Sequence, residues 1–138
     1  MTTISKNLRQ QVFERAKRLC EYCQSAQIII VLLEIDHILP ESLGGKTELD
    51  NLCVACRSCN AYKKDAIEAI DPQTNTMQPL FNPRQQRWND HFQWDKTGTQ
   101  MIGLTAIGRC TIEKLRINDA GMIQARHNWI LTGLHPPK

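Results

Sequence analysis

The chain has 138 residues, a net charge of +3 and 41% hydrophobic residues, which is typical of one compact folded domain and excludes a mainly disordered, collagen-like or coiled-coil chain. The longest apolar run has six residues, 28–33, against the roughly 20 that span a bilayer. Residues 1–6 lack the apolar core of a signal peptide, so we expect a cytoplasmic protein that binds no membrane.

The first predicted elements are a helix and a strand. Ser5 is a suitable N-cap, and apolar residues at helical spacing predict an amphipathic helix over residues 6–19. The β-branched run at residues 28–35 predicts a buried strand that ends at Asp36 and His37.

The middle of the chain is predicted to form a loop, a short strand and a second helix. The loop covers residues 40–46, and the short strand follows Asn51. The helix covers residues 57–69 and is stopped by Asp71 and Pro72.

The rest of the chain is predicted to form a small C-terminal unit. Residues 72–79 are the best linker candidate, which divides the chain into a core at 1–71 and an annex at 80–138. Within the annex we expect a hairpin over 91–104 and helices over 105–117 and 119–132. Its aromatic residues favour a core role. For its arginines, Arg84, Arg87 and Arg126, a structural role in the core and contact with the DNA backbone are about equally favoured.

The charges are unevenly distributed. Residues 21–79 carry four basic and nine acidic side chains, whereas residues 1–20 carry five basic and one acidic, and residues 80–138 eight basic and four acidic. An acidic middle favours a bound cation, and basic flanks favour a polyanion, although many small proteins show such scatter by chance.

Six cysteines in a reducing compartment are not expected to form disulfides. Cys20 and Cys23 form one C-x-x-C pair, and Cys53, Cys56 and Cys59 form two overlapping ones. Two such pairs supply four thiolates to one zinc ion, and spacing alone leaves the second pair open between Cys53/Cys56 and Cys56/Cys59. Isolated Cys110 is expected to be a small buried apolar residue.

Polar residues suited to phosphodiester hydrolysis lie between the cysteine pairs. This reaction needs a base that activates water and a cation that stabilises the developing negative charge. Asp36 and His37 are adjacent at the end of a strand, so their side chains can serve opposite sides of one phosphate. Without the cysteines, a local turn would be the preferred interpretation of this pair.

The order of these motifs resembles the HNH endonuclease family. The resemblance covers roughly residues 18–65 and consists of the first C-x-x-C pair, the Ile35-Asp36-His37-Ile38-Leu39-Pro40 segment, a Gly-Gly loop, Asp50-Asn51-Leu52, and Cys56-x-x-Cys59-Asn60-x-x-Lys63. It implies an α+β fold with a ββα-metal (His-Me finger) core, a structural zinc and a small C-terminal α+β annex. Asn60 replaces the family's final histidine, and a similar asparagine occurs in the HNH domain of CRISPR effector nucleases.

The resemblance also implies roles for single residues. His37 would be the general base, Asn51 would fix the loop and orient His37, and Asp36 and Asn60 would hold the catalytic cation. The structural zinc would be bound by Cys20, Cys23, Cys56 and Cys59, with Cys53 left as a core residue. Contacts with nucleic acid are expected from Lys63, Lys64, Arg57, Arg84 and Arg87.

The function that we expect is metal-dependent hydrolysis of DNA, leaving a 3′-hydroxyl and a 5′-phosphate. The oxygen ligand at Asn60 favours Mg²⁺ or Mn²⁺ over Zn²⁺ in the catalytic site, with other divalent transition metals possible. The substrate would be double-stranded DNA, with RNA as an alternative. The competing hypothesis is a non-catalytic zinc module that binds nucleic acid or protein.

Overall fold

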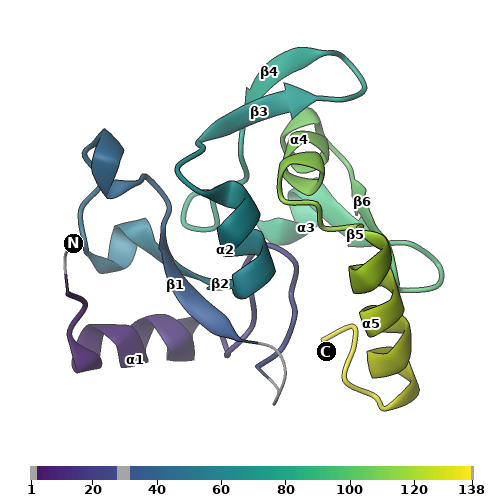
Figure 1. Ribbon diagram of the computed structural model, residues 1–138, viewed down its shortest axis with the longest axis horizontal. Helices are drawn as coiled ribbons and strands as arrows, with labels where there is room; N and C mark the ends of the chain where they lie inside the picture. The colour runs from purple at the N-terminus through teal and green to yellow at the C-terminus, as the bar shows by residue number, and fades with distance from the viewer. Residues whose placement is uncertain (1–2, 28–31, 138) are drawn as a thin grey trace.

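The computed structural model describes residues 3–27 and 32–137, which form a mixed fold of short helices and small antiparallel sheets (Figure 1). None of the helices in these two ranges has both the length and the hydropathy of a membrane-spanning segment. Three two-stranded sheets are formed by β1 with β2, β3 with β4, and β5 with β6. In chain order the elements are α1 (Lys6–Arg15), β1 (Leu33–His37), β2 (Leu52–Cys56), α2 (Arg57–Lys63), β3 (Glu68–Asp71), β4 (Thr76–Pro79), α3 (Trp88–His91), β5 (Phe92–Trp94), β6 (Met101–Gly103), α4 (Ala106–Lys114) and α5 (Ala120–Leu131).

Helix α1 begins as predicted and ends earlier than predicted. The Ser5 hydroxyl accepts a hydrogen bond from the Leu8 backbone N–H at 3.1 Å, which confirms the N-cap. The helix ends at Arg15 because Lys17 and Arg18 adopt left-handed backbone conformations, with φ of 55° and 54°. The Arg15 guanidinium donates to the backbone carbonyls of Leu49 and Leu52, so the end of α1 is tied to the start of β2.

Strands β1 and β2 and helix α2 follow one another and pack together. Residues 28–31 of the predicted strand lie outside the described residues, and β1 ends at His37, as predicted. The register pairs Asp36 with Cys53, and every residue of β2 is buried. One face of β1 contacts α2, because Asp36 pairs with Lys63 and Glu34 accepts a hydrogen bond from Asn60.

The prediction that the second helix runs to residue 69 is wrong. Helix α2 ends at Lys63, and Lys64 takes a φ of 51°. Residues 68–79 form a β-hairpin, in which 72–75 are the turn and Thr76–Pro79 is β4. The division into two domains stays a prediction.

The Asp71 side chain stabilises the hairpin of β3 and β4. Its carboxylate accepts hydrogen bonds from the Gln73 backbone N–H and the Thr74 hydroxyl, which shape the turn. The same carboxylate receives two hydrogen bonds of 2.9 Å from the Arg109 guanidinium on α4. The partner lies 38 residues away, so no local pattern indicates the pair.

The annex contains the predicted hairpin and two helices, and the segment from Gly103 to Arg109 joins them. The Thr105 hydroxyl caps α4, which is shorter than predicted. A Cβ atom on Gly108 would lie 2.1 Å from the His91 carbonyl oxygen, and one on Gly103 would lie 2.6 Å from the Arg109 nitrogen. Both positions therefore need glycine, because β5, β6 and α4 approach at backbone distance.

The annex also contacts the first C-x-x-C loop. The Arg84 guanidinium forms an ion pair with Glu21, and the Trp88 indole N–H donates to the Tyr22 carbonyl at 2.8 Å. The Trp94 indole N–H donates to the Gln24 side chain at 3.1 Å. Phe92 is buried, and Trp88 and Trp94 pack against the core, which confirms the core role predicted for these aromatic residues.

We predict that Asp71→Asn lowers the melting temperature by a few degrees at pH 7. The Arg109 guanidinium holds the pKa of Asp71 well below its usual range. The pair's stabilisation is therefore full above the unfolded pKa, near 4, and is lost as the pH falls below it. Thermal unfolding at several pH values measures the difference between wild type and variant, which should shrink below about pH 4. Glu113→Gln on the exposed face of α4 is the control, and an equal loss there would contradict the prediction.

Candidate metal centre and active site

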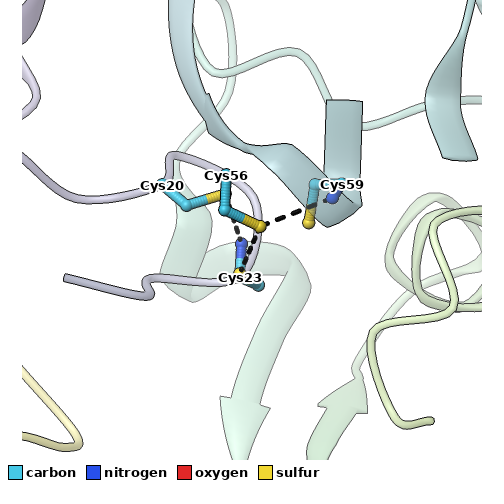
Figure 2. Close-up of side chains that lie close together, drawn as sticks. All are labelled: Cys20, Cys23, Cys56 and Cys59. Atoms are coloured by element: carbon cyan, nitrogen blue, oxygen red, sulfur yellow. Dashed lines mark hydrogen bonds between the residues drawn. The ribbon is translucent and has the colours of Figure 1, made fainter. Parts of the chain in front are cut away.

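Four buried cysteines from two separate segments meet at one point (Figure 2). All four sulfur atoms lie within 4.8 Å of one another, and the Sγ atoms of Cys23 and Cys56 are 3.7 Å apart. Zinc–sulfur bonds of about 2.3 Å in a tetrahedron place sulfur atoms about 3.8 Å apart, so the set fits a zinc ion. The four residues are Cys20, Cys23, Cys56 and Cys59.

Backbone and charge support this choice of ligands. The backbone N–H of Cys23 donates to the Cys20 sulfur, and that of Cys59 donates to the Cys56 sulfur, each at 3.4 Å. Burial raises the pKa of the Cys20 thiol, so four thiolates together need a cation that compensates their charge. The pair that spacing left open is therefore Cys56 with Cys59.

Cys53 lies away from this cluster. It is fully buried opposite Asp36, and its thiol donates to the Tyr22 hydroxyl at 3.5 Å. Burial raises the pKa of Cys53, which keeps it a neutral thiol. Cys110 is likewise buried, in agreement with its predicted packing role.

Arg126 on α5 is fully buried, so it does not contact DNA. Its guanidinium donates to the carbonyls of Thr99 and Ile117 and lies 5.2 Å from the centre of the Trp94 ring. Burial lowers the pKa of Arg126, while the charges of the four zinc-site cysteines act in the opposite direction. A zinc ion held by four thiolates would carry a net charge of −2, which the buried positive charge of Arg126 would offset.

Most of the residues predicted to act in catalysis, though not Asn51, line a second site, a cavity of about 580 Å³ between β1, the loop after it and α2. Asp36, His37 and Asn60 all line it. Asp36 and His37 are consecutive residues of β1, so their side chains leave opposite faces of the strand, and at the strand's end both border this cavity.

Asp36 is oriented by a buried ion pair. Its Oδ2 atom lies 3.0 Å from the Lys63 ammonium and accepts a hydrogen bond from the Tyr22 hydroxyl at 3.1 Å. Among the described residues all its polar contacts use Oδ2, which leaves Oδ1 for a ligand in the cavity. Burial raises the pKa of Asp36, and the Lys63 charge opposes this by favouring the carboxylate.

Lys63 therefore does not face nucleic acid, and that prediction is wrong. The side chain is buried, and its ammonium also donates to the carbonyls of His37 and Ile38. The three-residue spacing from Asn60 correctly predicted that both side chains lie on one face of α2, but it did not show that β1 covers this face. Its role is to hold Asp36 and the end of β1 in place.

The His37 ring is held at one nitrogen. Its Nε2 atom lies 2.9 Å from the Thr47 hydroxyl and 3.7 Å from the Glu41 carboxylate. A carboxylate only accepts hydrogen bonds, which favours the proton on Nε2 and leaves the lone pair on Nδ1. Thr47 and Glu41 were not predicted from the sequence: Thr47 is ten residues from His37, and Glu41 is four residues away but in a loop, where spacing does not fix which side chains meet.

Asn60 is oriented by a carboxylate in the same way. Its Nδ2 amide donates to Glu34 at 3.1 Å, and since Glu34 can only accept, the Oδ1 atom of Asn60 is the one left over. Glu34 was also missed, although it stands two residues before Asp36 and so on the same strand face. Asp36 and Asn60 thus each present an oxygen of the hard type that Mg²⁺ and Mn²⁺ prefer.

Asn51 holds the loop that borders the cavity. Its side chain accepts from the Leu39 backbone N–H and donates to the carbonyls of Leu39 and Lys46, all within 2.9 Å. Its backbone carbonyl accepts from the N–H of Ile38, next to His37. Asn51 therefore contacts the residue after His37 through its backbone, and its role in orienting His37 stays a prediction.

The other residues predicted to bind nucleic acid divide into two groups. Lys64, Arg57 and Arg87 are exposed, and Lys64 borders the catalytic cavity. Arg84 is partly buried and its guanidinium pairs with Glu21, and its contact with nucleic acid stays a prediction.

Comparison with protein families gives one match, the HNH endonuclease model, over residues 20–66. The chain therefore contains an HNH endonuclease domain. The matched segment begins at the first zinc-site cysteine and includes the last one, together with β1, β2 and α2. A search of curated proteins finds no match to the chain.

We predict that the HNH domain binds one zinc ion per chain and that Cys56→Ala loses it and fails to fold. Structural zinc sites contribute about 10–16 kcal/mol of apparent binding free energy, far more than one core contact. Metal analysis and circular dichroism measure both effects. Cys53→Ala is the matched control on the same strand and should keep its zinc at a cost of about 1–2 kcal/mol. Zinc retained by Cys56→Ala would contradict the assignment.

Proposed function

We propose that the protein is a metal-dependent endonuclease that hydrolyses phosphodiester bonds of double-stranded DNA. The observation that carries this proposal is the shared cavity, in which His37, Asp36 and Asn60 each keep one atom available. A module that only binds a partner through zinc has no use for this set. The HNH match supports nuclease activity in general.

In this proposal His37 is the general base. Its Nδ1 lone pair accepts a proton from a water molecule in the cavity as that water attacks phosphorus. The Thr47 hydroxyl and the Glu41 carboxylate stabilise the resulting imidazolium at Nε2. The hydrogen bonds of Asn51 to Leu39 and Lys46 hold the loop that places Thr47 and Glu41 beside the His37 ring.

Asp36 and Asn60 would hold the catalytic cation, Mg²⁺ or Mn²⁺, through their Oδ1 atoms. A bound divalent cation supplies positive charge that stabilises the phosphate and the leaving oxygen. Lys63 keeps Asp36 ionised, and Glu34 keeps the Asn60 amide from turning over. We further propose that β1, β2 and α2 form a ββα-metal unit, within a core at 1–71 to which the annex at 80–138 is attached.

We predict that His37→Ala keeps the fold and lowers cleavage by about 10²–10⁴-fold, the usual contribution of a general base. The assay incubates supercoiled plasmid with Mg²⁺ or Mn²⁺ and follows nicked and linear products. Circular dichroism and zinc content show that the variant is folded. Cleavage at the wild-type rate would refute the role of His37, and no cleavage of DNA by the wild type would favour the binding module or an RNA substrate.

We predict that Asn60→Ala weakens Mn²⁺ binding at least tenfold, because one of two oxygen ligands is lost. Titration calorimetry in the His37→Ala background measures this without turnover. Ser58→Ala on the same helix is the control, since it lies outside the catalytic cavity. Equal Mn²⁺ affinity in the Asn60 variant would exclude this residue as a ligand.

A further inference from the structure

A second cavity, of about 340 Å³, lies on α1 beside β1, and it is distinctly basic. Lys6, Arg9 and Arg18 contribute its cations, and Gln10, Phe13 and Gln27 line the rest together with one strand residue. None of the residues that line it is acidic. We define the three cations with Phe13 as the α1 basic site.

The two arginines of this site are held by one aromatic ring. The guanidinium of Arg9 lies 5.1 Å from the centre of the Phe13 ring, and that of Arg18 lies 5.9 Å from it. Phe13 itself is buried, so the ring is a fixed support. Both guanidiniums are thereby brought together before any ligand arrives, which lowers the entropy lost on binding.

The backbone takes an unusual conformation to place Arg18 there. Lys17 and Arg18 both have positive φ values, which is uncommon for residues other than glycine. This turn brings Arg18 back over Phe13 and lets it donate to the Gln27 side chain at 3.4 Å. Backbone strain of this kind persists where the surrounding structure holds it, often at a binding site.

The charge of the site is not neutralised within the described residues. Ion pairs there engage Lys63, Arg84 and Arg109, whereas none within 4 Å engages Lys6, Arg9 or Arg18. All three of these residues are exposed. Exposed, preorganised guanidiniums without a carboxylate are suited to phosphate, which they bind through two parallel hydrogen bonds.

The α1 basic site and the catalytic cavity are bordered by the same strand, β1. Leu33 lines the basic cavity, and Ile35 and His37, on the same face of β1, line the catalytic one. Ile4 lines the catalytic cavity and Lys6 the basic one, so the N-terminal segment borders both. The four residue steps from Leu33 to His37 span about 13 Å of strand, which equals about four nucleotides at 3.4 Å of rise each.

We propose that the α1 basic site binds backbone phosphates of the substrate strand about four nucleotides from the bond that is cut. This inference rests on the proposed nuclease function for its ligand. It assigns to α1 the task of holding the substrate in register with His37. The contact is to phosphate, so it adds affinity for every sequence equally.

The test measures binding without cleavage. Fluorescence anisotropy in the His37→Ala background follows a labelled DNA duplex at several salt concentrations. The double variant Arg9→Gln/Arg18→Gln should bind about tenfold more weakly, and the slope of log K against log salt should fall by about 1–2. Lys96→Gln/Lys114→Gln removes the same charge elsewhere and should change both values much less. Circular dichroism and zinc content confirm that all variants are folded.

Two results would overturn the proposal: unchanged binding in the double variant, or an equal loss in the charge-matched control. A labelled single-stranded RNA forms the second arm. The same loss seen only with RNA would support the phosphate site and correct the proposed DNA substrate. If His37→Ala still cuts while the arginine variant binds weakly, the proposed base fails and the α1 basic site stands.

Discussion

The arrangement of the molecule depends on the meeting of four cysteine sulfurs that come from two segments 32 residues apart. A sheet of two strands and a helix of seven residues bury too little surface to hold a fixed geometry by themselves. The cluster supplies the missing constraint at the N-terminus of α2, where Cys56 is both ligand and N-cap. It thereby fixes the positions of Asn60 and Lys63 relative to β1. The annex contacts the loop that carries the other pair of cysteines, through Glu21, Tyr22 and Gln24.

The uneven distribution of charge acquires a more specific meaning in three dimensions. The acidic middle contains Asp36 and Glu34, which face α2 beside the catalytic cavity. The two basic flanks are not equivalent. Three arginines of the C-terminal flank are used inside the protein, where Arg84 and Arg109 pair with carboxylates and Arg126 lies near the cysteine cluster. The N-terminal flank has its arginines exposed on α1 and in the turn directly after it, so the two flanks have the same net charge but use it differently.

Features with local signals were predictable from the sequence, and features made by distant contacts were not. The N-cap at Ser5, the Asp36-His37 pair at a strand end and the four-cysteine set all follow from spacing or from family resemblance. The burial of Lys63 and the hairpin at residues 68–79 do not, because the first depends on β1 and the second on Arg109. Apolar residues between Ala66 and Ile70 fit a helix equally well, and only the pairing with β4 decides against it. The contacts of Glu34 with Asn60 and of Thr47 with His37 were hidden for the same reason, and that of Glu41 because loop spacing does not fix which side chains meet.

Tyr22 lies between Cys20 and Cys23 in the sequence and contacts both the annex and a residue of the catalytic cavity. Its carbonyl accepts from Trp88 of the annex, and its hydroxyl donates to the same oxygen of Asp36 that Lys63 contacts. The loop between Cys20 and Cys23 is therefore connected to the Asp36 carboxylate through the single buried side chain of Tyr22. Free energies of binding are reciprocal, so whatever zinc does to the affinity of Asp36 for its cation, that cation does equally to the affinity for zinc. If both ions bind as proposed, Tyr22 is the side chain through which such a coupling would pass.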